Sequence, residues 1–140
     1  MIIDGSDNVD YFLYKFNISK KDQKRIKIID EFYKDKISSK SFSENSLNKI
    51  FYFKGKQSLI DILSFWIFTS RKIDKKILNF IDQFRSKDLP NMPFGAKFLM
   101  DKYQIPEGKN LGNKLRDIEE EWVNNNFKLS EKQIDKIVNR

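Results

Sequence analysis

The sequence contains no cysteine and no histidine among its 140 residues, and these two absences exclude much catalytic and metal-binding chemistry. Without cysteine the chain can form no disulfide, zinc knuckle or thiol nucleophile, and without histidine it lacks the commonest general base and metal ligand. It also has no Asp-x-Asp pair of the kind that holds two metal ions in nucleotidyltransferases. We therefore expect no catalytic residue, no metal site and no cofactor.

Long apolar runs are missing as well. The longest, residues 59–68, is interrupted by Asp61 and Ser64 and has about half the length of a membrane span. Residues 1–10 are acidic and lack the basic start and apolar stretch of a signal peptide. Together with a mean hydropathy of -0.63, these features predict a chain without a membrane segment and with a cytoplasmic location.

Apolar residues recur with helical spacing along nearly the whole chain. Hydrophobic residues make up 39% and aromatic residues 14%, which indicates a folded protein, and the length is typical of one domain. We predict an all-α, compact domain of about seven or eight helices over residues 1–140, with any subdivision near the Pro-rich segment 88–93. Residues 59–68 should form the central, most buried helix. A strand over residues 50–53 is the alternative at one place only.

Several polar residues predict where helices begin and end. Ser19, Ser41, Asp74 and Ser130 each precede an apolar stripe and can cap a first turn, and Gly55 is a stop signal. Pro106 is expected in the first turn of a helix after the Pro-rich break. The apolar face of the first helix is expected to include Phe12, Leu13 and Phe16. The apolar face of the helix that follows Pro106 is expected to include Leu111, Leu115, Ile118 and Trp122.

Positive charge exceeds negative charge, with 27 Lys and Arg against 20 Asp and Glu, so the net charge of +7 favours a polyanionic partner. Lysine greatly outnumbers arginine and alanine occurs only at Ala96, a composition typical of AT-rich codons. A lysine-rich solvated surface without a ligand is therefore an alternative. The acidic run 117–121 lies on a predicted helix, where consecutive residues point in different directions, so we expect a solvated face.

Gly108 and Gly112 lie four residues apart and share one helix face, where they leave a backbone-level groove. The free amides of the first turn and the positive end of the helix dipole could hold a phosphate there. Close packing against a neighbouring helix is the alternative role of the two glycines. The predicted RNA-binding residues are Lys97, Lys102, Gly108, Lys109, Asn110, Gly112, Lys114 and Arg116, with a secondary basic cluster of Arg71, Lys72, Lys75 and Lys76.

Residues 92–129 contain a dense pattern of glycine, proline and apolar residues, namely Gly95, Pro106 to Gly108, Leu111, Gly112, Leu115, Ile118, Glu119, Trp122 and Phe127. In order and spacing this pattern resembles the end of the class II tRNA nucleotidyltransferase (CCA-adding enzyme) and bacterial poly(A) polymerase family. The resemblance is weaker but continuous upstream, in Phe16 to Ser19 with Arg25 and in residues 47–63. Tyr103 and Gln104 stand where the family usually has a glycine.

The resemblance implies a helical body and tail that hold the acceptor and T arms of a tRNA while an N-terminal catalytic head adds nucleotides. These 140 residues contain no counterpart of that head and no Glu-Asp-x-x-Arg motif for nucleotide selection. Asp22 to Arg25 and Asp82 to Arg85 have the spacing of that motif but lack its preceding acid. We therefore expect an RNA-binding module that is not catalytic alone.

Other functions remain open at this stage. The chain could be the protein-interaction half of a split nucleotidyltransferase that docks on a separate catalytic subunit, in which case Phe12, Leu13 and Phe16 would form an exposed apolar patch. It could also be a folded remnant without activity. A helix-hairpin-helix DNA binder is a further alternative, because residues 105–108 loosely resemble that turn, but the paired glycines of such hairpins are missing.

Overall fold

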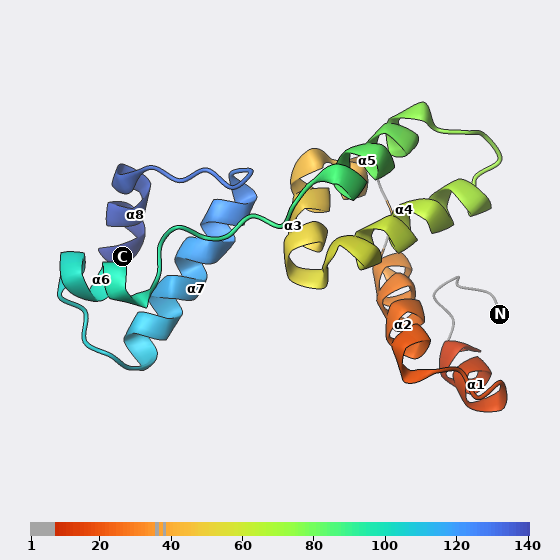
Figure 1. Cartoon of the computed structure of the whole chain (residues 1–140), viewed down its shortest axis with the longest axis horizontal. Coiled ribbons are helices and arrows are strands. Elements are labelled where there is room, and N and C mark those ends of the chain that lie inside the picture. The colour runs from red at the N-terminus through yellow and green to blue at the C-terminus, as the bar shows by residue number, and fades with distance from the viewer. Residues whose placement is uncertain (1–7, 36, 38) are drawn as a thin grey trace. The chain divides into compact units, whose positions relative to one another are not determined.

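The computed structural model describes residues 8–140 except 36 and 38, and this part of the chain is all-helical (Figure 1). The predicted all-α fold of seven or eight helices is confirmed. Gly5, Ser6 and Asp7 of the acidic start lie outside the described residues. The helices are α1 (Asn8–Lys15), α2 (Lys20–Lys34), the 3-10 turn η1 (Ser39–Phe42), α3 (Glu44–Lys54), α4 (Lys56–Thr69), α5 (Lys75–Ser86), α6 (Ala96–Tyr103), α7 (Lys109–Asn124) and α8 (Glu131–Val138).

The chain divides into two compact units, Met1–Leu89 and Pro90–Arg140. The division falls inside the segment 88–93, where the sequence places any subdivision. Helices α1 to α5 belong to the first unit and α6 to α8 to the second. Residues 50–53, the alternative strand, lie within α3, since no strand partner exists among the described residues.

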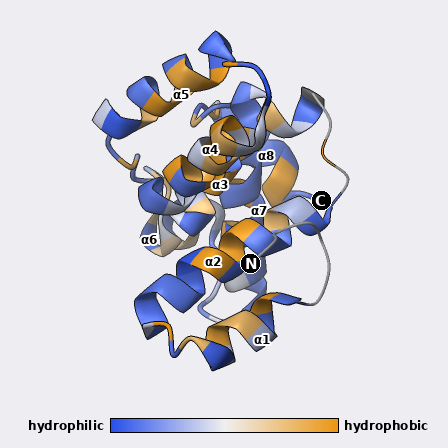
Figure 2. Ribbon diagram, turned by 90° about the vertical axis from the view of Figure 1, so that its right-hand side faces the viewer, coloured by the Kyte–Doolittle hydropathy of each residue, from blue (hydrophilic) through white to orange (hydrophobic). Residues whose placement is uncertain are grey.

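Helix α4 is the centre of the first unit and packs against α2, α3 and α5. Leu59, Ile62 and Leu63 are fully buried, as expected of the most apolar helix. Phe68, the last residue of the run 59–68 that was predicted to be buried, is instead 85% exposed. It follows Leu59 by nine residues, which at 3.6 residues per turn places it on the opposite side of the helix. The hydrophobic and hydrophilic residues that alternate along α5 show the same two-sided pattern (Figure 2).

An ion pair joins α2 to α4. The guanidinium of Arg25 donates two hydrogen bonds of 2.8 Å to the carboxylate of Asp61, which also accepts from Gln57. Burial of Asp61 acts to raise its pKa, but the bonds from Arg25 and Gln57 prevail and hold that pKa below its ordinary value. The Tyr33 hydroxyl donates to the carbonyl of Ile62, 3.1 Å away, and adds a second link between the two helices.

Leu99, Ile105, Leu111, Ile118, Ile134 and Ile137 form the core of the second unit. They come from α6, the loop after it, α7 and α8. Trp122 is also buried, and its ring packs edge-on against Phe127 with centroids 5.1 Å apart. The apolar face predicted for α7 is therefore confirmed, with Leu115 at its partly buried edge.

Most predicted helix starts are confirmed. The side chains of Ser19, Asp74 and Ser130 each accept a hydrogen bond from a first-turn amide. At α3 the cap is Ser43 and not Ser41, because residues 39–42 form a 3-10 turn that delays the α-helix. Pro106 lies outside the first turn of α7. Gly108, with φ 152°, adopts a backbone conformation that suits glycine and is the N-cap, so the helix begins only at Lys109.

Candidate nucleic-acid interface

The first turn of α7 is open. Gly108 offers no side-chain cap, and the first intrahelical bond runs from the amide of Gly112 to the carbonyl of Gly108, 3.1 Å away. The amides of residues 109–111 are the donors that a helix leaves without an intrahelical partner. A Cβ added at Gly108 or Gly112 would meet nothing within 4 Å. Close packing against a neighbouring helix therefore does not explain these glycines.

The charges of α7 oppose its dipole. The helix begins with Lys109, has no acid in its first turn and has no base in its last turn. Lys109, Gly112 and Arg116 follow the spacing i, i+3, i+7 and so share one exposed stripe. The acidic residues Asp117, Glu119, Glu120 and Glu121 lie in the second half of the helix. A cation at a helix start costs about 0.3–1 kcal/mol, but it adds to the positive potential that the dipole produces there.

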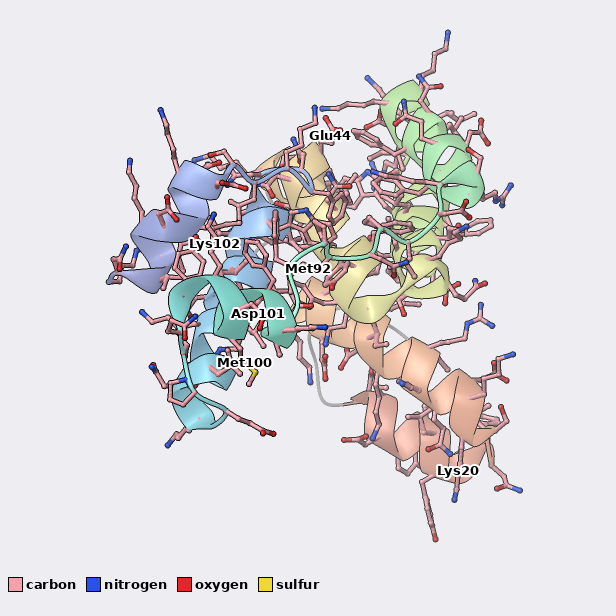
Figure 3. All side chains as sticks on the ribbon, turned by 60° about the vertical axis from the view of Figure 1, so that its left-hand side comes forward. Lys20, Glu44, Met92, Met100, Asp101 and Lys102 are labelled. Atoms are coloured by element: carbon pink, nitrogen blue, oxygen red, sulfur yellow. The ribbon has the colours of Figure 1, made fainter. Side chains whose placement is uncertain are left out.

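Lys102, one of the predicted RNA-binding residues, connects α6 to α8. Its Nζ lies 3.0 Å from Oε2 of Glu131 and within 5.5 Å of the ring centroids of Phe98 and Tyr103. The bond to Glu131 raises the pKa of Lys102 above its ordinary value. Figure 3 shows Lys102 beside Met100 and Asp101 on α6. Its charge is thus partly neutralised by a carboxylate of its own unit.

Lys114 occupies a different place from the one the sequence suggests. It was predicted to bind RNA, but its Nζ donates to the carbonyls of Ile137 and Arg140 at 3.1 and 3.2 Å. These oxygens belong to the end of α8 and the residues after it, where a helix leaves carbonyls without partners. Lys114 therefore stabilises the end of α8.

The remaining predicted residues of this unit lie at the surface. Lys109 and Asn110 are exposed in the first turn of α7, and Arg116 is exposed about two turns further along. Lys97 is exposed in the first turn of α6. The structure thus brings Gly108, Lys109, Asn110 and Gly112 together at one helix start, with Arg116 on the same stripe, while Lys102 and Lys114 contact α8.

The secondary basic cluster belongs to the first unit. Arg71 and Lys72 lie in the loop before α5, Lys75 and Lys76 lie in its first turn, and all four are exposed. The carboxylate of Asp74 accepts from the Lys76 amide at 2.9 Å and so occupies this helix start. The first-turn amides of α5 are therefore less available to a ligand than those of α7. Arg71, Lys72 and Lys75 line a shallow hollow of about 540 Å³ together with Ile73, which is 76% exposed.

Sequence reasoning missed a third basic region, a groove between α2 and the end of α3. Four lysines and the exposed ring of Phe53 line this groove, whose volume is about 690 Å³. The spacing of Lys20, Lys24 and Lys27 indicates one helical stripe and could have identified one wall. The opposite wall could not be predicted, because it depends on how α3 packs in the first unit.

Among the described residues, no group of three or more acidic side chains is placed to hold a metal ion. In the same part of the chain, no helix has both the length and the apolar character that crossing a bilayer requires. Glu119 and Glu121 are half-buried and Glu120 is exposed. Consecutive positions along α7 direct these three carboxylates to different sides.

Comparisons with protein-family models, curated proteins and solved structures found no match to this chain.

Proposed function

We propose that this chain binds structured, tRNA-like RNA in the cytoplasm, with the first turn of α7 as its principal phosphate site. The observation that carries the proposal is the combination of uncapped amides and a basic stripe at that turn. The charge order along α7 disfavours the helix itself, so stability does not explain it. A phosphate bound there would contact the amides of residues 109–111 and the side chain of Lys109.

Structured RNA suits this surface better than a small anion. Arg116 extends the basic stripe by about 10 Å from Lys109, at 1.5 Å per residue, which allows contact with more than one phosphate. Lys97 adds a further exposed cation in the same unit. Phosphate contacts of this kind read the shape of an RNA helix more than its sequence. The chain has no proposed catalytic residue, and nucleotide addition would require a separate head.

The double variant Lys109→Glu with Arg116→Glu tests this function. We expect it to lose most affinity for a tRNA acceptor-arm hairpin, measured by fluorescence anisotropy between about 50 and 200 mM salt. The negative slope of log affinity against log salt should become shallower by about 1.8 if each residue contacts one phosphate, at about 0.9 per contact for a duplex.

The matched control is Lys132→Glu with Lys136→Glu, which makes the same change of charge on exposed residues of α8. The control should keep most of the affinity for the hairpin. Equal losses in both double variants would mean that only net charge matters, and an unchanged α7 variant would refute the site.

A second candidate function is docking on a nucleotidyltransferase catalytic head. Helix α1 favours it, because Tyr11, Tyr14 and Phe16 are 65%, 87% and 57% exposed. The patch differs from the predicted one, which consisted of Phe12, Leu13 and Phe16, because Leu13 is buried within the first unit and Phe12 is half-buried. Two exposed aromatic rings on this short helix and a third just after its end form a surface that a protein partner could cover.

Tyr11→Ser with Tyr14→Ser tests the docking function, using co-sedimentation with the catalytic head of a class II tRNA nucleotidyltransferase. We expect the variant to lose the complex and to keep hairpin binding, because the two surfaces lie on different units. If the unmodified chain does not co-sediment with the head, or if the variant does so equally well, this candidate is wrong.

A further inference from the structure

The groove between α2 and the end of α3 carries charge and an aromatic surface in one place. Its lysines are Lys20, Lys24, Lys27 and Lys54, against the single acid Glu31. Figure 3 shows Lys20 at the start of α2. This charge balance indicates an anionic occupant.

The basic wall is long enough for more than one anionic group. Lys20, Lys24 and Lys27 follow the spacing i, i+4, i+7, so their Cα atoms share one face of α2 and extend over about 10 Å. Lys27 lies 3.3 Å from Asp10, but the two side chains are 54% and 85% exposed. Such exposed ion pairs contribute little to stability, so a phosphate can replace the carboxylate of Asp10.

Phe53 supplies the aromatic surface. Its side chain is 51% exposed, and the ring of Tyr52 packs edge-on against it with centroids 5.1 Å apart. That contact restrains the Phe53 ring while leaving much of it open to the groove. A base stacked on an aromatic ring is a main element of single-strand recognition, and it requires a nucleotide that is not paired.

We propose that this groove binds unpaired RNA, with phosphates on the lysines of α2 and one base stacked on Phe53. An acidic peptide would satisfy the lysines but would gain no particular benefit from an exposed aromatic ring, so the ring favours RNA. The inference rests on the proposed function only in taking RNA as the ligand. It uses residues of the first unit, whereas the α7 site lies in the second.

Phe53→Leu separates base stacking from charge. We expect the full chain carrying this substitution to bind a labelled oligouridine of about 12 nucleotides roughly 5- to 50-fold more weakly, while its affinity for inorganic polyphosphate changes less than about twofold. Lys20→Gln with Lys24→Gln should weaken binding of both ligands. It should also lower the salt slope for oligouridine by about 1.4, at about 0.7 per phosphate.

Phe68→Leu and Lys132→Gln with Lys136→Gln are the controls, since they change a still more exposed phenylalanine ring and an equal charge elsewhere. Both should leave oligouridine binding unchanged. A larger loss from Phe68→Leu than from Phe53→Leu would overturn the assignment. The assignment would also be wrong, in favour of an acidic protein partner, if polyglutamate displaced the labelled oligouridine as strongly as unlabelled oligouridine does and Phe53→Leu had no effect.

The two RNA sites fail in distinguishable ways. The Lys109→Glu, Arg116→Glu variant should lose the hairpin and keep oligouridine, and Phe53→Leu should do the reverse. If Phe53→Leu lowers hairpin affinity as much as oligouridine affinity, the groove is not specific for unpaired RNA and the inference is wrong. Retained hairpin binding with no oligouridine binding would refute the groove site alone.

Discussion

Helices α7 and α8 are neighbours in one unit, yet their termini are built in opposite ways. Helix α8 begins with a capping box, in which Ser130 and Gln133 each accept from the other's amide, and it has an acid in its first turn and a base in its last. These charges agree with the helix dipole. Helix α7 begins at a glycine without a side-chain cap and carries its charges in the reverse order.

The difference follows from length and packing. Helix α8 has only 8 residues, and helices this short are marginal without outside support. It receives that support from its caps and from bonds between Tyr103 and Asp135 and between Lys102 and Glu131. Helix α7 has 16 residues and a larger buried stripe. It can therefore leave its first turn open to a ligand without losing its place in the fold.

The largest expected effect concerns the packing that supports α7. Trp122→Ala should lower the free energy of unfolding by about 3–5 kcal/mol, because removal of the buried ring leaves a cavity and abolishes the contact with Phe127. Urea unfolding followed by circular dichroism measures this change. A loss below about 1 kcal/mol would mean that α7 is held by something other than its apolar face.

The next effect concerns the cap of α8. Ser130→Ala removes the hydroxyl that accepts from the Gln133 amide and should cost about 1 kcal/mol. Hydrogen exchange of the α8 amides should accelerate more than that of the α7 amides. Ser86→Ala, a substitution of an exposed serine at the end of α5, is the control and should have little effect on α8.

Tyr103→Phe tests the side-chain links to α8. At neutral pH it should cost about 0.5–1.5 kcal/mol through the lost bond to Asp135. Burial first, and then that bond, raise the pKa of Tyr103 above its ordinary value, so the folded state favours the neutral phenol. Its contribution to stability is complete below about pH 10 and is lost as the pH rises through the raised pKa.

Unfolding experiments at increasing alkaline pH check the second part of this prediction. The unmodified chain should lose stability more steeply than Tyr103→Phe, so that the difference between them narrows above about pH 10. Tyr14→Phe changes an exposed tyrosine and serves as the control. Parallel curves for all three chains would contradict the role of the Tyr103 phenol.

The smallest expected effect has the opposite sign and sharpens the comparison most. Lys109→Glu places an acid in the first turn of α7 and should raise the free energy of unfolding by about 0.3–1 kcal/mol. The same substitution should weaken binding of the tRNA hairpin. A variant that is more stable but binds less well would show that Lys109 serves a ligand at the expense of the helix. A loss of stability would contradict our account of α7.

The sequence predicted much of the fold because its signals are local. Ser19, Asp74 and Ser130 cap helices as expected, since a cap depends on residues within one turn. The burial predicted for Phe68 was wrong because it was inferred from the apolar run alone. Nine residues separate Phe68 from Leu59, and at 3.6 residues per turn this places the two on opposite sides of the helix.

The candidate site was predicted less well, because long side chains reach residues distant in sequence. Lys114 precedes the carbonyl of Ile137 by 23 residues, and nothing near Lys114 in the sequence indicates that contact. Lys102 reaches Glu131 over 29 residues. Lys109 and Gly112 lie in the first turn of α7, as helical spacing predicts, but Gly108 is the N-cap and not part of the helix, because α7 begins later than Pro106 indicated. The groove beside Phe53 required the packing of α3 near α2 and could not be predicted.

The division of the chain between Leu89 and Pro90 puts the α7 site and the Phe53 groove on separate units. An RNA that reaches both would bind bivalently, and after the first contact forms, the second becomes intramolecular. Two modest affinities would then combine into strong avidity. An RNA with a helix next to an unpaired stretch would be retained in preference to an RNA that offers only one of the two.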